Sequence, residues 1–199
     1  MIDAKLMPPS ASFHASWLAS WDEWGTLEQD GSAAFVAARY NLDLRQRSDF
    51  SEWINRLHHM PLEEFQPPEG LVNQSTIWVV EGSSYLGSAS LRHSLANEYL
   101  TEVGGNIGYG IRPSTRGRGL AKLALNGALE EARALGMERV MVTCKQPNTA
   151  SARTIEACGG VLESVRPPES FSPDLGVTEP IRRYWINLPL PGKRIPGIL

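Results

Sequence analysis

The sequence predicts one domain of the α/β class, in an α+β arrangement where helices flank a mixed β-sheet. A length of 199 residues fits one ordinary domain. With 42% hydrophobic and 21% charged residues, the composition is that of a chain with a packed core, which excludes disordered, collagen-like and fibrous proteins. Hydrophobic residues recur with a helical period in some segments and form short strand-like runs in others. The predicted order is helices, three strands, helix, strand, helix and two strands.

The N-terminal part is predicted to form one short strand and two helices. Lys5-Leu6-Met7 has the pattern of a strand, which Pro8 and Pro9 end. A helix begins at Ser10 or Ser12 and carries Phe13, Trp17, Leu18, Trp21 and Trp24 at helical spacing. A second helix begins near Ser48 or Ser51, with Phe50, Trp53, Ile54 and Leu57 on one face. We expect the tryptophans of both helices in the core.

The remaining chain is predicted to form the larger part of the sheet. A hairpin turn at Gly82-Ser-Ser84 indicates two antiparallel strands, and a third candidate ends at Pro113. The expected strands are 76–81, 85–93, 106–111, 139–144, 161–165 and 182–188, and the expected helices are 119–135 and 150–158. Gly105, at the start of the third of these strands, and Gly108 and Gly110 within it indicate a bulge or a close approach of another backbone.

Charge and cysteine content exclude several classes of function. The net charge of −3 gives no basic field for nucleic acid or anionic lipid. Cys144 and Cys158 are too few for a disulfide framework or a cysteine-only zinc site, and they fit a reducing compartment. The N-terminus shows no secretory pattern, and no run approaches the roughly 20 apolar residues of a membrane span. We therefore expect a cytoplasmic protein without metal, nucleic acid or membrane partners.

The segment from Ile111 to Ala121 carries the clearest chemical signal. It lies between a predicted strand and a predicted helix, and its glycines let the backbone approach a ligand. The first N–H groups of a helix are unpaired and attract anions, above all phosphate, and Arg116 and Arg118 add charged donors. A solvated basic turn is the alternative interpretation. A Walker A loop is absent, because Gly119 is followed by Leu120 and Ala121 instead of lysine and serine or threonine. A dinucleotide fingerprint is absent as well, because Lys122 stands where the third glycine is needed.

These residues resemble the GNAT superfamily of acyl-CoA-dependent N-acetyltransferases. Arg116 to Ala121 matches its Arg/Gln-x-x-Gly-x-Gly/Ala signature, and Asn148-x-x-Ser151 is similar to a second family segment. Four stretches also resemble a bacterial subgroup: 90–93, 104–114, 148–153 and 182–185. The resemblance is strong from Ser75 to Leu188 and weak before that. It implies a mostly antiparallel, twisted sheet of six to seven strands with about four helices.

The resemblance implies acetyl-CoA as co-substrate and divides the single domain 1–199 into three parts. Residues 75–188 would bind the acyl-CoA, residues 1–74 would shape the acceptor side, and 189–199 would be a tail. The amides of the 117–122 segment would cradle the pyrophosphate, and backbone N–H groups near Gly108 and Gly110 would polarise the thioester carbonyl. The implied cofactor-binding residues are Ile111, Arg112, Arg116, Gly117, Arg118, Gly119, Leu120, Ala121, Asn148 and Ser151.

The acid and base that many GNAT enzymes use are missing from their usual places. Gly105 stands at the position of the usual glutamate, and Ile155 stands at that of the usual tyrosine. Glu102 and His93 are the nearest candidates for the base, and Ser151 is the candidate donor to the sulfur. Each has an ordinary alternative, as a surface residue or a first-turn helix serine. Cys144 is more typical of a core thiol than of a nucleophile.

The resemblance therefore predicts transfer of an acetyl group to a primary amine of a small molecule or peptide by direct attack. The absent glutamate and tyrosine also motivate an alternative, a non-catalytic acyl-CoA sensor or interaction module. The sequence names no acceptor, and it leaves a homodimer open.

Overall fold

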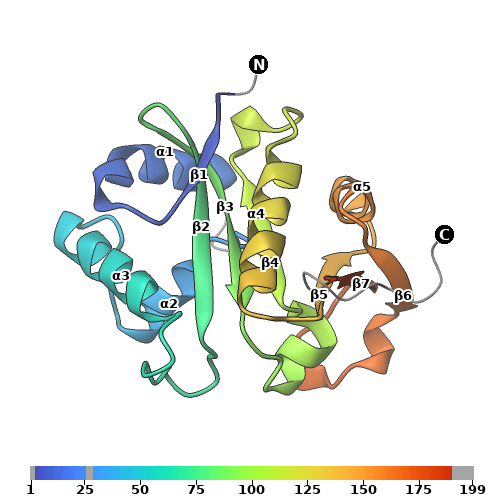
Figure 1. Ribbon diagram of the computed structural model, residues 1–199. Helices are drawn as coiled ribbons and strands as arrows, with labels where there is room; N and C mark the ends of the chain where they lie inside the picture. The colour runs from blue at the N-terminus through green and yellow to red at the C-terminus, as the bar shows by residue number, and fades with distance from the viewer. Residues whose placement is uncertain (1–2, 26–28, 190–199) are drawn as a thin grey trace.

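A seven-stranded sheet forms the centre of the computed structural model, which describes residues 3–25 and 29–189 (Figure 1). Its strand order is β1-β2-β3-β4-β5-β7-β6. The strands are β1 (Lys5–Met7), β2 (Gln74–Glu81), β3 (Ser84–Arg92), β4 (Ile107–Ile111), β5 (Arg139–Lys145), β6 (Val161–Arg166) and β7 (Ile181–Asn187). Every neighbouring pair is antiparallel except β4 and β5, which run parallel. The predicted mostly antiparallel sheet is confirmed.

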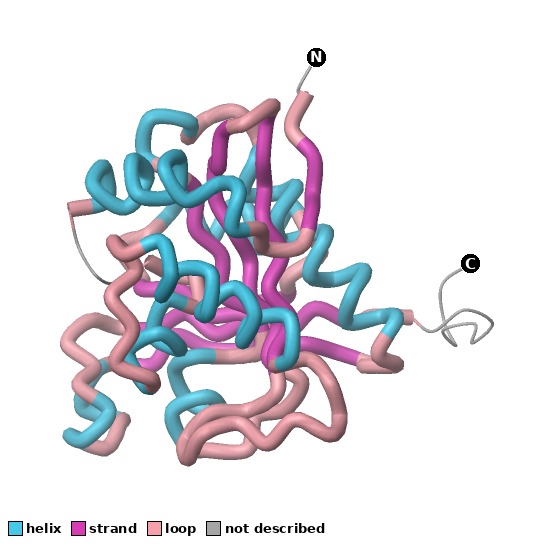
Figure 2. The backbone as a smooth tube through the Cα atoms, turned by 90° about the vertical axis from the view of Figure 1, so that its left-hand side faces the viewer, coloured by secondary structure: helices cyan, strands magenta, loops and turns pink. Residues whose placement is uncertain are grey.

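Helices cover both faces of the sheet (Figures 1 and 2). The α-helices of the described part are α1 (His14–Trp24), α2 (Ala34–Arg39), α3 (Arg47–His59), α4 (Leu120–Ala134) and α5 (Thr149–Ala157). The first three pack on one face through β2 and β3, whereas α4 crosses β2, β3 and β4 on the other face and α5 packs on β5. This arrangement follows from strand alternation, because successive side chains of β2 and β3 enter opposite cores.

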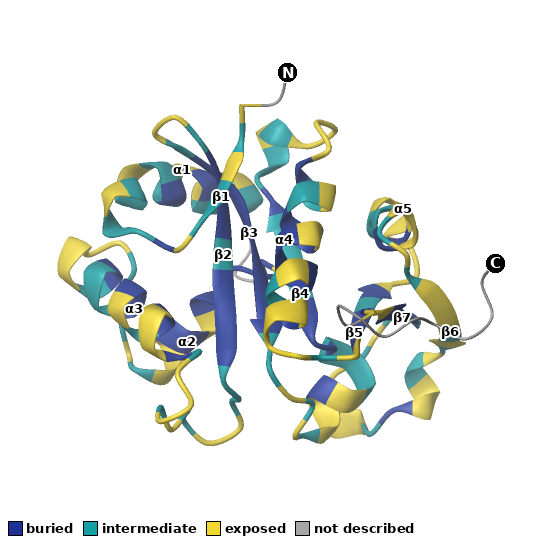
Figure 3. Cartoon of the chain, in the orientation of Figure 1, coloured by how far each residue is buried: buried dark blue, intermediate teal, exposed yellow. Residues whose placement is uncertain are grey.

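Two hydrophobic cores result, one on each face (Figure 3). The first joins α4 and α5 to Val79, Leu91 and Ile107. The second is aromatic: Trp17, Trp53 and Trp78 are 0–1% exposed, and their rings contact one another or Phe50 at 5.2–6.4 Å between centroids. The tryptophans at 17 and 53 are core residues, as the helical spacing predicted. Trp21 is half-buried beside this core, and Trp24 is half-buried outside both cores, so the prediction was wrong for Trp24.

The elements that the sequence missed are short. The helix α2 has six residues and begins after Ala33, which has φ 57° and gives no side-chain cap, so neither periodicity nor a capping signal marks it. The chain therefore has five α-helices within its described residues, rather than about four. A π-helical turn, Leu100–Gly104, precedes β4 and ends at Gly105 with φ 62°. Gly105 thus lies outside the strand in which it was predicted.

Candidate functional site

The parallel strands β4 and β5 separate almost as soon as they meet. They pair at a single position, Ile107 with Val142. The side chain of Asn106 completes the junction, since its Oδ1 accepts from the Met141 N–H at 2.8 Å and its Nδ2 donates to the Arg92 carbonyl at 3.2 Å. Beyond this junction β4 has no strand partner on the β5 side. We call the space between the two diverging strands the split.

The backbone of Tyr109 and Ile111 is directed toward the split. On the other side of β4, the Arg92 N–H donates to Asn106 and the Arg112 N–H donates to Leu86. Alternate residues of a strand bond to the same neighbour, so Gly108 and Gly110 bond to β3, and the odd-numbered residues turn the other way. The Ile111 carbonyl confirms this direction, because it accepts from Arg116 Nε at 3.1 Å. The N–H that can polarise a carbonyl in the split is therefore that of Tyr109, rather than a glycine N–H.

Gly108 and Gly110 allow the backbone of another segment to approach β4 closely, and they do not mark a bulge. The register between β3 and β4 is continuous from Gly87–Ile111 to Leu91–Ile107. A Cβ atom at position 110 would lie 2.5 Å from the Asp30 carbonyl oxygen, and one at position 31 would lie 2.6 Å from Tyr109 Cα. The loop before α2 therefore lies directly on the glycine face of β4, and Ser90 Oγ holds it by donating to the Gly31 carbonyl at 2.9 Å.

The N-terminus of α4 lies at the end of the segment that follows β4. Gly117 and Gly119 adopt φ of 78° and 77°, left-handed conformations that glycine tolerates best. No side chain caps the helix at Gly119, so the N–H groups of Leu120 and Ala121 are left for an external acceptor. The predicted anion-binding geometry, a glycine-rich turn before an uncapped helix, is present.

The three arginines of this segment each contact another side chain of the protein. Arg116 lies over the Trp24 ring at 4.7 Å, and Arg118 pairs with Glu81 at 2.6 Å. Arg112 pairs with Glu23 of α1 at 2.5 Å. This hydrogen-bonded guanidinium lowers the pKa of Glu23 to about 2. The three arginines thus make contacts within the protein, whereas the backbone N–H groups at the start of α4 have no side-chain cap.

The opposite wall of the split is the start of α5. Asn148 is the N-cap residue, and its Oδ1 accepts from the Ser151 N–H at 3.1 Å. Ser151 Oγ lies 2.9 Å from the Tyr109 hydroxyl, which also donates to the Ser151 carbonyl at 3.2 Å. Burial raises the pKa of Tyr109 to about 12. Burial also raises the pKa of the neighbouring Cys144 thiol, which argues against a thiolate nucleophile.

The two residues predicted as bases lie on different faces of the sheet. His93 follows β3 and its Nε2 lies 3.0 Å from Ser75 Oγ, which donates to Glu131 of α4. Burial holds the pKa of His93 below its usual value. Glu102, in the π-helical turn, pairs with Arg166 and with Arg183, the latter at 3.1 Å. Neither residue makes a hydrogen bond to Ser151 or Tyr109, the pair that joins β4 to α5.

Asp30 is a carboxylate near the split that sequence reasoning missed. It is exposed, and its charge acts on both Arg92 of β3 and Cys144 of β5. Because β4 lies between those two strands, the Asp30 carboxylate lies close to β4. Its position could not be read from the sequence, since it depends on the fit of the Gly31 backbone against Gly108.

The described residues hold neither a cluster of metal ligands nor a membrane-spanning helix. Within residues 3–25 and 29–189, no three His, Cys, Asp or Glu side chains come together as metal ligands. No helix in the same ranges has the length and apolar character needed to cross a membrane.

Solved structures of acetyltransferases share this fold. They include the acetyltransferase yncA from Salmonella typhimurium, solved with acetyl-CoA (TM-score 0.60, 12% identity, 98% of this chain and 99% of that one). The microcin C7 self-immunity acetyltransferase MccE, in complex with acetyl-CoA and AMP, has a TM-score of 0.63 and 18% identity over 94% and 93%. The ribosomal-protein-S5-alanine acetyltransferase from Vibrio fischeri has a TM-score of 0.64 and 14% identity over 94% of each chain. No curated protein sequence matches the chain.

The sequence also matches a family model. Residues 12–161 match the model of the acetyltransferase (GNAT) domain, which is more than half of the chain. The protein therefore belongs to the GNAT acetyltransferase family, and the resemblance drawn from Arg116–Ala121 and Asn148–Ser151 is confirmed.

Proposed function

We propose that this protein transfers the acetyl group of acetyl-CoA to a primary amine of a small molecule or peptide. The observation that supports it most is the split between β4 and β5, with the uncapped N-terminus of α4 following β4. An extended arm fits beside an unpaired strand edge, and a pyrophosphate fits a helix N-terminus. The acetyl-CoA in the yncA and MccE structures supports the same co-substrate here.

The residues along this path fit the parts of the co-substrate. The N–H groups of the segment 117–121, with Arg116 and Arg118 beside them, bind the pyrophosphate. The backbone of Ile111 and Arg112 lines the pantetheine arm on the β4 side, and Asn148 lines it on the α5 side. Acetyl-CoA supplies an activated thioester, and the Tyr109 N–H stabilises the charge that develops on its carbonyl oxygen.

Ser151 and Tyr109 together replace the missing helix tyrosine. The hydroxyl pair joins β4 to the start of α5, and it offers a proton to the departing sulfur. Because burial raises the pKa of Tyr109 to about 12, the phenol is protonated at neutral pH. The Ser151 hydroxyl orients the phenol and donates a hydrogen bond to it in turn.

The acceptor amine must lose a proton before it attacks. An amine of pKa near 10 costs about 4 kcal/mol to deprotonate at neutral pH, so a nearby carboxylate lowers the barrier. Glu102 and His93 remain predictions for this base. Asp30 is a third candidate for the base, because its charge acts on Arg92 of β3 and on Cys144 of β5, the strands on either side of β4.

A non-catalytic acyl-CoA sensor is the second candidate function. Gly105 and Ile155 occupy the places of the usual base and acid. A protein that binds acetyl-CoA without turning it over would keep the split and the α4 N-terminus but would have no need of the Tyr109–Ser151 pair.

The test is a thiol-release assay on acetyl-CoA with a panel of amines, amino acids and peptides, run beside thermal unfolding. Acetyl-CoA at about 100 times its Kd adds about 2.7 kcal/mol of stability, so the melting temperature should rise. Turnover with at least one primary amine, reduced in Asp30→Asn, supports the enzyme. A raised melting temperature without turnover supports the sensor. No change in melting temperature contradicts both.

A further inference from the structure

Arg92, the last residue of β3, reaches from β3 onto β4. Alternate residues of a strand point to the same face of a sheet, so Arg92 shares a face with Ser90, which binds the Gly31 carbonyl. A Cβ atom at position 108 would lie 3.2 Å from the Gly31 N atom and 3.8 Å from Arg92 Nη2. The Arg92 guanidinium therefore lies on the glycine face of β4, beside the loop before α2.

This place is next to the proposed site of acetyl transfer. Gly108 directly precedes Tyr109 in β4, and the Tyr109 N–H is directed toward the split. The guanidinium is thus one residue along the strand from the N–H proposed to stabilise the thioester oxygen. Because α4 packs on the opposite face of β4, we expect an acceptor amine to approach from the glycine face, where Arg92 lies.

The guanidinium lacks the anion with which a buried arginine is normally paired. Its hydrogen bonds to the described residues both come from Nη1, which donates to the Gly104 carbonyl at 3.0 Å and to the Gly105 carbonyl at 3.1 Å. None of the ion pairs among residues 3–25 and 29–189 includes Arg92. Burial lowers the pKa of Arg92, so its charge is poorly solvated. Arginine is rarely buried without a partner, and a carboxylate at Nη2 would provide one.

Asp30 places a negative charge on the same face. Its carbonyl oxygen would lie 2.5 Å from a Cβ atom at position 110, so its backbone lies against β4. The charge of its side chain acts on Arg92 without an ion pair between the two. A positive and a negative group on one face complement a molecule that carries both charges, with its ammonium toward Asp30 and its carboxylate toward Arg92.

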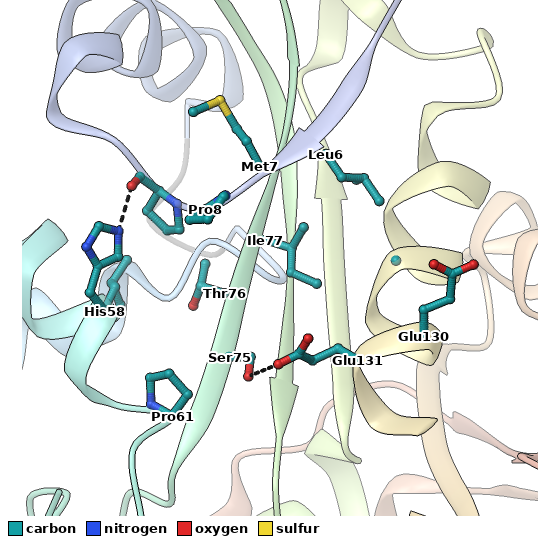
Figure 4. Close-up of a pocket in the computed structure, with 13 residues that line it drawn as sticks. Leu6, Met7, Pro8, His58, Pro61, Ser75, Thr76, Ile77, Glu130 and Glu131 are labelled. Carbon is teal, nitrogen blue, oxygen red and sulfur yellow. Dashed lines mark hydrogen bonds between the residues drawn. The ribbon is translucent and has the colours of Figure 1, made fainter. Parts of the chain in front are cut away.

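The groove along the outer edge of β2 does not suit such a molecule (Figure 4). Its space of about 730 Å³ is lined on the α4 side by Glu130 and Glu131, and no lysine or arginine is among the described residues that line it. The strand β3 lies between this edge and β4. A carboxylate in the groove would be repelled by α4, and an amine there would be far from the split.

We propose that Arg92 binds the carboxylate of the acceptor and that the acceptor is a free α-amino acid. This inference rests on the proposed acetyl transfer, and it narrows the primary amine to one with a carboxylate beside it. A simple alkylamine leaves the guanidinium unpaired, as does a peptide N-terminus whose neighbouring carbonyl is an amide. Arg92 is therefore the residue that determines specificity for the acceptor.

The test compares each standard amino acid with its own carboxamide in the thiol-release assay with acetyl-CoA. The carboxamide keeps the amine and the side chain and loses the negative charge. We expect kcat/KM for the preferred amino acid to exceed that for its carboxamide by about tenfold or more, since hydrogen bonds to charged groups are the stronger ones. In Arg92→Gln this preference should disappear, while the kcat/KM for the carboxamide stays close to its wild-type value. The ratio is compared between the two proteins, so the different basicity of the two amines cancels.

Arg92 also binds the carbonyls of Gly104 and Gly105, so a purely structural role has to be distinguished. Loss of that role would lower kcat/KM for the amino acid and for the carboxamide alike. Arg92→Lys keeps the charge and should retain part of the preference, and circular dichroism checks the fold of both variants. The matched control is Glu130→Gln in the groove, which should leave both values unchanged.

Two results overturn the inference and leave the proposed acetyl transfer in place. One is equal kcat/KM for amino acids and carboxamides in the wild-type protein, and the other is a preference that persists in Arg92→Gln. Absence of turnover with every amine contradicts the proposed acetyl transfer itself, and this inference falls with it.

Discussion

Tyr109 combines two roles because of where it stands on β4. Its backbone turns toward the split, while its side chain reaches across to Ser151 at 2.9 Å and touches the core formed with α4 and α5. One residue thereby presents an N–H on the strand and a phenol beside α5. The family's usual tyrosine position, Ile155, is fully buried in that same core. In the proposed reaction, this phenol on β4 supplies the proton that the resemblance assigns to a tyrosine at position 155.

We predict that Tyr109→Phe lowers kcat and leaves the KM for acetyl-CoA nearly unchanged. General-acid groups contribute about 100-fold or more to a rate, and phenylalanine keeps the ring that packs in the core. Steady-state kinetics at several pH values measure both constants. Ser151→Ala is the companion variant and should show a smaller loss, because the phenol remains. A kcat within twofold of wild type for Tyr109→Phe would remove the phenol from the mechanism.

The contact between Tyr109 and Ser151 could not be predicted from the sequence. Asn148 and Ser151 could be recognised because they share one short segment with fixed spacing. Tyr109 is 42 residues from Ser151, and only the divergence of β4 from β5 brings them together. Asp30 was missed for the same reason. Its place depends on glycines at 31, 108 and 110 that permit two backbones to touch.

Among the elements, the helix α4 was predicted closely from its periodicity. Its residues Leu120, Ala124, Leu125, Ala128, Leu129 and Ala132 recur on one face and enter the core, and its bounds of Leu120–Ala134 lie within one residue of the expectation. By contrast, α2 has six residues and no cap, too few for a period to appear. Long amphipathic elements could therefore be predicted, and short ones set by tertiary contacts could not.

The N-terminus of α4 can be tested with two substitutions that differ by one charge. Gly119→Asn and Gly119→Asp have nearly the same shape, and both residue types tolerate the left-handed backbone found there. We expect the free energies of unfolding of the two variants to differ by no more than about 1 kcal/mol, with the aspartate variant the more stable because of the helix dipole. We expect CoA to bind the aspartate variant at least tenfold more weakly, because a carboxylate competes with the pyrophosphate.

Calorimetric titration with CoA measures this difference. The asparagine variant controls for the added side chain and for any backbone strain. Equal CoA affinities in the two variants would mean that the pyrophosphate does not lie at this helix end.

At the scale of the whole molecule, the helix α1 is joined by side-chain contacts to the segment between β4 and α4. The ring of Trp24 lies under Arg116, and Glu23 accepts from Arg112 and from the Ser114 N–H. The loop after α1 also lies against β4. The proposed acceptor side and the proposed CoA side therefore share one set of contacts, although they are separated in sequence. Residue patterns showed each half, but the contacts that join them come from the fold.

The Glu23–Arg112 pair predicts how the stability of this junction depends on pH. The folded pKa of Glu23 is about 2, against 4.5 for the free side chain. A lowered pKa means that the pair stabilises the fold above pH 4.5 and that this contribution is lost as the pH falls toward 2. The free energy of unfolding should therefore fall more steeply between pH 4.5 and 2 in wild type than in Glu23→Gln. Asp22→Asn is the matched control, because its ion pair to Arg45 is 59–60% exposed. Denaturant unfolding across this pH range measures all three proteins, and parallel curves for wild type and Glu23→Gln would show that the pair does not stabilise the junction.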